Sequence, residues 1–182
     1  MAIFDYDRRR VYEYALHWAY RRNPLFLDFA DLGGDCTSFV SQCIFAGCCR
    51  MNFTADFGWY YVSADDRAPA WTGVEFLYNF LTANDSDGPF GREMPLRNLR
   101  TGDVIQLADD VGEWYHSLTV IGRDADDILV AAHTIDSFAR PLSTYNYASL
   151  RGIRIEGYRS ERDDCDCFEG LISGTSLQLC GR

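Results

Sequence analysis

The sequence contains no lysine, and all 17 of its basic residues are arginine. A Schiff base on lysine, a lysine general base and the lysine of a phosphate-binding loop are therefore excluded. The chain also lacks an apolar run long enough to span a bilayer, and no basic segment followed by an apolar run opens it. We therefore expect a soluble protein, cytoplasmic as the sequence stands, or secreted if a signal sequence has been removed.

Positive charge is scarce, because the 17 arginines are outnumbered by 27 acidic residues and the formal net charge is −10. This charge disfavours nucleic acid and an anionic membrane surface as partners. Hydrophobic residues make up 47% of the 182 positions, which is typical of a globular chain. The length suits one domain, which we assign to residues 1–159, followed by a tail over residues 160–182.

The seven cysteines are an odd number, so a disulfide framework cannot be complete within one chain, and we expect reduced thiols. Neither Cys48-Cys49 nor the late Cys165 and Cys167 have histidines nearby at a zinc-site spacing. The tail is acidic and rich in turn residues, which predicts a loosely ordered extension. Within it, the Cys165-x-Cys167 pair could bind a soft metal or form a strained disulfide, but a lone C-x-C pair is weak evidence for either.

The hydrophobic spacing changes from helical to strand-like along the chain, and this order predicts an α+β domain. The expected helices cover residues 8–22, a segment from the Cys36 region that stops at Gly47, and residues 74–82. The expected strands form an antiparallel meander over residues 104–107, 114–121, 128–133 and 153–158.

One stretch combines glycines, a helix start and a cysteine: Gly33-Gly34-Asp35-Cys36-Thr37-Ser38-Phe39-Val40-Ser41-Gln42. The glycines allow a tight backbone approach, and Asp35 and Thr37 are typical helix-start residues. Cys36 therefore falls in the first turn of a helix, where unpaired N–H groups and the helix dipole favour a thiolate. At this helix start, formed by Asp35 and Cys36, the same N–H groups can receive a developing oxyanion.

Two of the three histidines lie at the ends of expected strands. His116 is near the start of one strand and His133 ends the next, so we expect them side by side in an antiparallel pair. We assign Cys36 as nucleophile, His116 as general base and then acid, and His133 as the group that orients His116. Asp136 is the alternative orienter. A zinc site made by Cys36, His116 and His133 is a further alternative, because thiolate and imidazole are good zinc ligands.

An aromatic loop follows the cysteine helix and contains Trp59-Tyr60-Tyr61. Aromatic side chains serve equally well as a satellite core cluster and as the wall of a substrate groove. Because the loop leaves the chain just after the cysteine helix, we predict that Trp59, Tyr60 and Tyr61 line the groove.

The cysteine motif, together with Tyr6-Asp7-Arg8, Arg22-Asn23-Pro24, His116-Ser117 and Ala132-His133-Thr134, closely resembles the putative amidase domain family of bacteria. Asp35-Cys36-Thr37, Gly102-Asp103-Val104 and His116 are more distantly similar to the NlpC/P60 and CHAP peptidases. The resemblance extends over about residues 5–158. One departure is Ser38, which stands where the family usually has asparagine.

The resemblance implies a papain-like, NlpC/P60-like fold with N-terminal helices packed on an antiparallel sheet. It also implies a cysteine hydrolase, an amidase or peptidase with a Cys-His-His or Cys-His-Asp triad. Such an enzyme cleaves amide bonds through a thioester acyl-enzyme and needs no cofactor. The implied partner is a peptide or peptidoglycan fragment, and the implied location is then the cell wall. An acyltransferase using the same residues and a non-catalytic peptide- or glycan-binding module are the alternatives.

Overall fold

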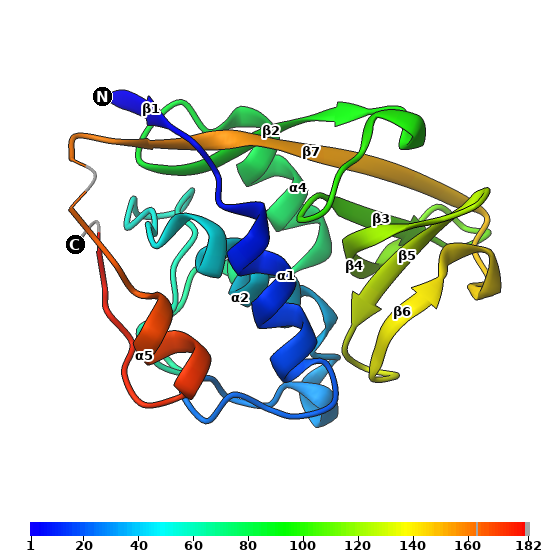
Figure 1. The fold of residues 1–182 in the computed structure, drawn as a ribbon, viewed down its shortest axis with the longest axis horizontal. Coiled ribbons are helices and arrows are strands. Elements are labelled where there is room, and N and C mark those ends of the chain that lie inside the picture. The colour runs from blue at the N-terminus through cyan, green and yellow to red at the C-terminus, as the bar shows by residue number, and fades with distance from the viewer. Residues whose placement is uncertain (163, 181–182) are drawn as a thin grey trace.

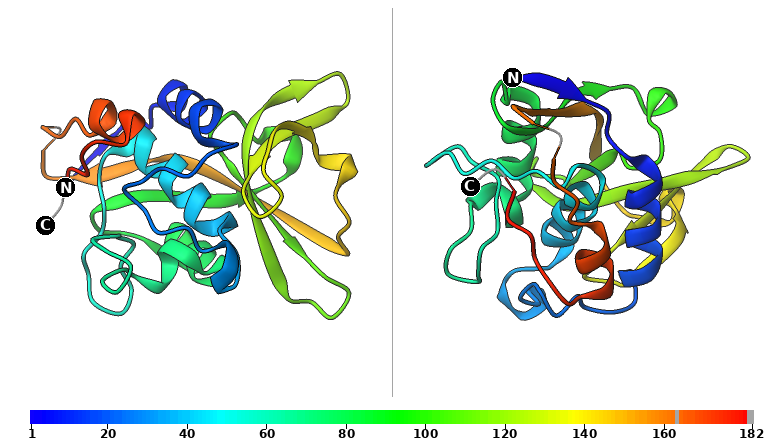
Figure 2. Two further views of the ribbon diagram at one scale, coloured as in Figure 1. Left: turned by 90° about the horizontal axis from the view of Figure 1, so that it is seen from below. Right: turned by 60° about the vertical axis from the view of Figure 1, so that its left-hand side comes forward.

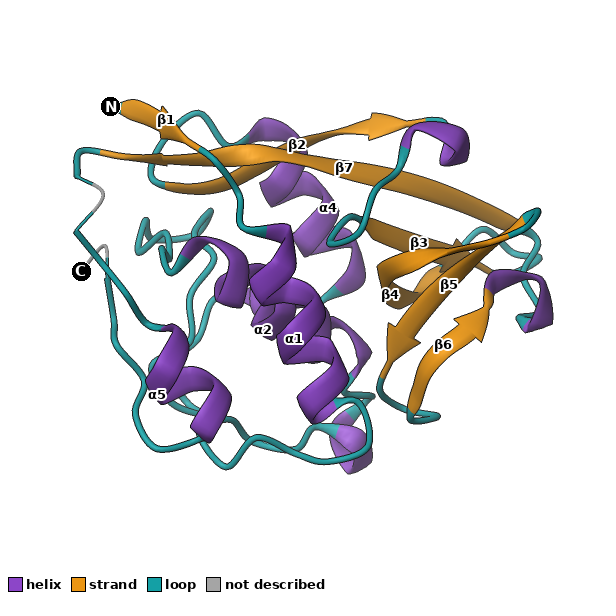
Figure 3. Ribbon diagram, in the orientation of Figure 1, coloured by secondary structure: helices purple, strands orange, loops and turns teal. Residues whose placement is uncertain are grey.

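The protein is an α+β structure in which helices pack on a curled antiparallel sheet (Figures 1 and 3). The computed structural model describes residues 1–162 and 164–180. The strand order is β1-β7-β3-β4-β5-β6, and β2 pairs with β7 beside this path. Every pairing is antiparallel. The strands are β1 Ala2–Phe4, β2 Gly88–Met94, β3 Val104–Ala108, β4 Trp114–Asp124, β5 Asp127–Ala132, β6 Ser137–Pro141 and β7 Ser149–Ser160.

The helices occupy one end of the long strand β7, and the β4–β6 strands occupy the other end (Figures 1 and 2). The α-helices are α1 Arg8–Trp18, α2 Cys36–Cys48, α3 Pro69–Thr72, α4 Val74–Ala83 and α5 Phe168–Ser173. Short 3₁₀ turns are η1 Ala30–Leu32, η2 Leu96–Asn98 and η3 Leu142–Thr144. All 13 residues of α2 are buried, because α1, α3, α5 and strand β4 surround it. None of the described helices has both the length and the apolar character needed to cross a bilayer.

Alternation of side chains along the strands gives the sheet two buried faces. Val104, Ala131 and Ile153 belong to the large core shared with the helices. Their strand neighbours Ile105 and Val130 belong to a second, smaller core on the opposite face. This second core also contains Leu99, Leu107, Leu118, Val120, Ile128, Ala132 and Leu142. A residue's position in the strand therefore decides which of the two cores it faces.

The predicted order of helices followed by strands is confirmed, with three differences in the elements. Helix α1 begins as expected, capped by the Asp7 carboxylate, but ends at Trp18 because the N–H of Arg21 bonds the Trp18 carbonyl and closes a turn. Helix α2 continues past Gly47 and ends at Cys48, and the next residue, Cys49, caps it in the left-handed conformation. A Cβ at Gly47 would lie 2.7 Å from Val11 Cγ2, so this glycine permits close packing with α1. Strands β1, β2 and β6 and helices α3 and α5 lie outside the predicted elements.

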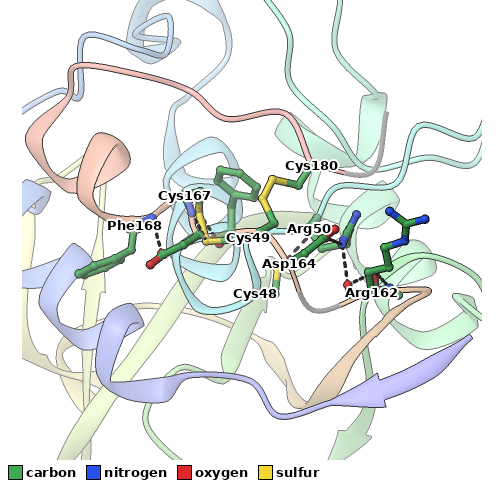
Figure 4. Close-up of a disulfide and its surroundings, with 12 residues drawn as sticks. Cys48, Cys49, Arg50, Arg162, Asp164, Cys167, Phe168 and Cys180 are labelled. Atoms are coloured by element: carbon green, nitrogen blue, oxygen red, sulfur yellow. Dashed lines mark hydrogen bonds and ion pairs between the residues drawn. A yellow bond between two sulfur atoms is a disulfide. The ribbon is translucent and has the colours of Figure 1, made fainter.

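The tail folds back onto the helical end of the molecule (Figure 1), and Figure 4 shows a disulfide that holds it there. Cys49 is paired with Cys167, and Cys165 with Cys180, so the expectation of seven reduced thiols is wrong for these four residues. The Cα–Cα distances are 5.4 and 6.1 Å, within the ordinary range for disulfides. Cys165 and Cys167 are therefore bonded to other cysteines and not to each other, so they do not form the local disulfide for which the C-x-C spacing was weak evidence.

The tail is also held by its apolar residues, so the described part is not the loosely ordered extension that its composition predicts. Phe168 and Leu171 of α5 lie in the large core. The carbonyl of Cys180 accepts a hydrogen bond from the N–H of Met51 at 3.1 Å, next to the end of α2. Helix α5 has too few apolar side chains for hydrophobic spacing to predict it from the sequence. The two disulfides hold it against the core.

Candidate active site

Cys36 is the first residue of α2, and the chain enters this helix through two glycines in left-handed conformations. Gly33 has φ 105° and Gly34 has φ 112°, values that L side chains rarely adopt. Asp35 occupies the N-cap position, but its side chain bonds none of the N–H groups of the first helical turn. Those N–H groups therefore remain available at the helix start, where they favour negative charge.

The Asp35 carboxylate turns away from the helix and joins a buried network. Its Oδ2 lies 2.6 Å from Nδ1 of His133, and its Oδ1 accepts a hydrogen bond from the N–H of Phe29 at 3.2 Å. Nε2 of His133 donates to the carbonyl of Trp18 at 3.0 Å. The imidazole also stacks on Phe39 of α2, with ring centroids 3.9 Å apart. Asp35 and His133 are each 1% exposed, so this pair is cut off from solvent.

Arg22 extends the network toward the surface. Its Nε lies 3.3 Å from both Asp35 and Asp28, and its two terminal nitrogens each lie 2.9 Å from an oxygen of Asp136. Asp136, the alternative orienter from the sequence, is therefore paired with Arg22 in a two-bond arrangement. This pairing directs its carboxylate to the cation rather than to His116.

Cys36 and His116 line the same cavity, which has a volume of about 310 Å³. The Cys36 Sγ atom lies 4.0 Å from the carbonyl oxygen of Tyr115, the residue before His116, and 3.8 Å from Thr37 Oγ1. No hydrogen bond joins Cys36 to His116 directly. The cavity is lined by Gly33, Gly34, Cys36, Tyr115, His116, Thr134, Ile135, Arg140, Thr144, Tyr145 and Asn146.

The environment of His116 keeps its ring neutral. Burial disfavours the imidazolium and the nearby positive charge of Arg140 repels it, so the pKa of His116 falls to about 4. The ring lies 5.9 Å from the ring of Tyr145, centroid to centroid. At neutral pH the residue is therefore a proton acceptor, which is the state required of a general base.

The two histidines are not neighbours, which corrects the expectation from the strand order. Thr119 of β4 pairs with Ala131 of β5, so the same register sets Ser117, rather than His116, opposite His133. A shift of one residue turns a side chain to the other face of a sheet. His133 consequently faces the helices with Ser117, whereas His116 lines the cavity together with Thr134.

The aromatic loop does not form the groove wall predicted from its position in the chain. Trp59 is 0% exposed, stacks on Phe80 and donates a hydrogen bond from its Nε1 to Ser41. Tyr61 is buried, and its hydroxyl accepts a hydrogen bond from the N–H of Leu27. Tyr60 stacks on Phe53. These contacts place the loop in the core and around it, because α2 offers a wholly buried surface on the side where the loop returns.

Seven cavity residues were not predicted as site residues from the sequence: Tyr115, Thr134, Ile135, Arg140, Thr144, Tyr145 and Asn146. Arg140 lies in β6, a strand of only five residues, Thr144 ends the 3₁₀ turn η3, and Tyr145 and Asn146 follow it, so no hydrophobic periodicity marks these four positions. The only sequence signal there is the cluster of turn-forming and aromatic residues after Pro141. Such a cluster predicts a loop but does not indicate which side of the sheet it covers.

Cys36, His116 and His133 are not arranged as the ligands of a zinc ion, which was the alternative considered from the sequence. Both ring nitrogens of His133 face acceptors, namely Asp35 and the Trp18 carbonyl, and the ring lies on the other side of the sheet from His116. Within residues 1–162 and 164–180, no group of three or more His, Cys, Asp or Glu side chains is arranged to hold a metal ion.

The fold and the cavity together describe a class of protein. It is an α+β protein in which a cysteine at a helix N-terminus and a histidine from the adjoining sheet line the same cavity. The chain belongs to the putative amidase domain family, whose family model matches residues 5–155. This membership indicates a hydrolase of the amidase type.

One relative among curated proteins is the uncharacterized protein YhbB of Bacillus subtilis (strain 168), which is 29% identical over 140 residues. The match covers 75% of this chain and 44% of the relative, so the chain spans less than half the length of that protein. No solved structure matches the chain.

The Asp35–His133 pair leads to a prediction about stability. His133→Ala leaves the Asp35 carboxylate buried with one of its partners removed, and breaking such a pair costs about 3 kcal/mol of unfolding free energy. Asp35→Ala is expected to cost a similar amount, and the double variant less than the sum, because the two residues act as one unit. Urea unfolding of the three variants measures this coupling.

His17→Ala is the matched control, because His17 is exposed on α1. It is expected to change the unfolding free energy little. Additive losses in the double variant would contradict the coupling. A stable His133→Ala protein with an altered pH–activity profile would instead support the orienting role that the sequence predicts for His133.

Proposed function

We propose that this protein is a cysteine-dependent hydrolase of amide bonds, with Cys36 as nucleophile, His116 as general base and a papain-like arrangement of the two. One observation carries the proposal. Cys36, at the start of α2, is 6% exposed but lines an open cavity with a neutral histidine, whereas the other two free thiols, Cys43 and Cys48, are buried away from this cavity. Burial raises the pKa of each of those two thiols to about 12, so they are unreactive.

In the first half of the reaction, His116 takes the proton of the Cys36 thiol as the sulfur attacks the carbonyl carbon. The C–S bond forms, and the carbonyl oxygen becomes an oxyanion. The free N–H groups at the start of α2, including that of Cys36, are suitably placed donors for this charge. The protonated His116 then gives its proton to the leaving amine, the C–N bond breaks, and a thioester remains on Cys36.

In the second half, water attacks the thioester carbonyl while His116 accepts one of its protons. The C–S bond breaks, the carboxylic acid leaves, and the proton returns to the sulfur. His133 is placed in this scheme as a residue that holds Asp35, and through it the first turn of α2, in position. A variant without His133 would therefore keep some activity, because Cys36 and His116 remain, but the first turn of α2 would be less well ordered.

The resemblance to wall-acting peptidases favours peptide amides as substrates, including those of peptidoglycan stem peptides. Disulfides persist in oxidising compartments, so the pairs Cys49–Cys167 and Cys165–Cys180 support action outside the cytosol. This environment agrees with a cell-wall substrate. The coarser part of the proposal, hydrolysis of an amide, does not depend on the identity of the peptide.

The proposal is tested by mass spectrometry of the intact protein after incubation with peptidoglycan fragments and with small amides. The expected result is a transient mass increase equal to the acyl part of the substrate, mapped to the peptide that contains Cys36. A product joined to an added amine would identify an acyltransferase. Retention of uncleaved fragments, with no covalent adduct, would identify a binding module and contradict the proposal.

The pKa of His116 leads to a prediction about pH. The rate falls only when His116 becomes protonated, so kcat/KM is expected to rise with pH through about 4 and to stay level above that region. An unperturbed histidine would place this rise near pH 6.5. Circular dichroism over the same pH range separates loss of the base from unfolding. A rise centred near 6.5 in a folded protein would contradict the environment assigned to His116.

A further inference from the structure

Arg140 carries the one permanently charged side chain among the described residues that line the Cys36 cavity. Thr144 holds one edge of its guanidinium: Nε donates to Thr144 Oγ1 at 2.8 Å, and Nη2 donates to the Thr144 carbonyl at 3.0 Å. The guanidinium carbon also lies 3.9 Å from the centre of the Tyr145 ring. Tyr145 in turn lies within hydrogen-bond distance of Ser137, 3.2 Å between the hydroxyl oxygens. The cation is therefore held in place before any ligand arrives.

The charge of Arg140 is not neutralised. No carboxylate in residues 1–162 and 164–180 forms an ion pair with it, and its Nη1 donates to none of the described groups. Many other arginines, among them Arg8 and Arg22, have a carboxylate partner. A fixed guanidinium with a free edge is the usual protein partner for a carboxylate.

Two acidic residues line a second cavity that adjoins the Cys36 cavity. That cavity contains Asp109 and Asp110 and shares Tyr115, Tyr145 and Asn146 with the Cys36 cavity. The Asp109 carboxylate is occupied by the N–H groups of Val111 and Glu113, so it serves its own turn. Negative charge is thus present beside the cavity, while the cavity that holds the nucleophile presents a cation.

We propose that Arg140 binds a carboxylate of the substrate, so that the amide cleaved at Cys36 belongs to a molecule with a carboxylate group near the scissile bond. This inference rests on the proposed function and specifies its substrate class: acidic amides and peptides, in preference to neutral ones. Arg140 selects the substrate and takes no part in proton transfer. The positive charge of Arg140 also lowers the pKa of His116. The same side chain would therefore bind the substrate carboxylate and help to keep the general base neutral.

The test compares two small ligands that differ in one charge, N-acetylglycine and N-acetylglycinamide. Their binding to the Cys36→Ala variant, which cannot form a thioester, is measured by ligand-observed NMR. N-acetylglycine is expected to bind about tenfold more tightly, the size of a typical charge-assisted contact. Arg140→Gln in the same background is expected to remove this preference. Arg140→Lys is expected to keep part of it, because lysine supplies the charge without the planar fork.

The matched control is Arg97→Gln, which changes the net charge equally at an exposed position in η2. It is expected to leave the preference unchanged, and urea midpoints verify that each variant is folded. Equal binding of the two ligands to the Arg140-containing protein overturns the inference. An undiminished preference in folded Arg140→Gln overturns it as well.

A second measurement distinguishes failure of this inference from failure of the proposed function. Iodoacetate and iodoacetamide alkylate Cys36 in the protein that retains it, and their rate ratio is normalised to the ratio with glutathione. The inference expects the normalised ratio to fall about tenfold in Arg140→Gln and to stay constant in Arg97→Gln. An unchanged ratio with rapid labelling of Cys36 overturns the role of Arg140 alone. Labelling of Cys43 or Cys48 ahead of Cys36 overturns the nucleophile itself.

Discussion

Cys36→Ala is expected to lower amide hydrolysis by about 10⁴-fold or more, because Cys36 is the one thiol among the described residues that line the cavity, and the thioester requires a thiol. His116→Ala is expected to lower it to a similar extent, and the double variant little further, because nucleophile and base act as a unit. Turnover of an amide that the wild-type protein cleaves is the measurement, with kcat and KM determined separately. The loss is expected in kcat, since both residues act on the transition state.

Cys43→Ala is the matched thiol control, because Cys43 lies in the same helix but is completely buried in the core. It removes a sulfur of α2 without touching the cavity, and turnover is expected to stay within a few-fold of wild type. Both cysteine variants should keep the far-UV circular dichroism of the wild type. Hydrolysis that continues at the wild-type rate in folded Cys36→Ala would show that the cysteine is not the nucleophile.

Loss of the Cys49–Cys167 disulfide is expected to produce the largest change in stability. The bond joins residues 118 positions apart, and the loop entropy removed from the unfolded chain corresponds to about 4–5 kcal/mol for a loop of this length. The bond also holds α5 against the helices, where Phe168 and Leu171 are buried in the core. A Cys49→Ala/Cys167→Ala double variant is expected to unfold at a much lower urea concentration than the wild type.

The second disulfide supplies an internal comparison. Cys165 and Cys180 are 15 positions apart, so a Cys165→Ala/Cys180→Ala variant is expected to lose less, at most about 3 kcal/mol. Adding a reductant to the wild type should reproduce both losses together. Urea midpoints that are the same with and without reductant would contradict the pairing of these four cysteines.

The position of the candidate nucleophile could be predicted from the sequence because its determinants are local. The glycines, Asp35 and the apolar spacing after Cys36 all act within ten residues, and helix α2 begins at Cys36 as expected. Helix α4 and strands β3 and β5 likewise follow from short periodic patterns. Membership of the putative amidase domain family is confirmed by a match over residues 5–155.

The partners of the histidines could not be predicted, because they depend on strand register. Order along the chain places His116 and His133 at the same end of two neighbouring strands, but the Thr119–Ala131 pairing sets them one residue out of phase. Register is decided by which face of each strand finds an apolar partner, and this requires both cores to be assembled. The same step brings His133 to Asp35, although the two are 98 residues apart.

The sequence by itself determined the α+β class, the helix that begins at Cys36 and the identity of the candidate nucleophile and base, since each rests on neighbouring residues. Only the tertiary structure decided that Arg140 joins the cavity, that Trp59 and Tyr61 belong to the core, and that the tail is fastened by two disulfides. These features join segments distant in the chain. Their free energy depends on the packing of the whole fold, and no local pattern of residues records it.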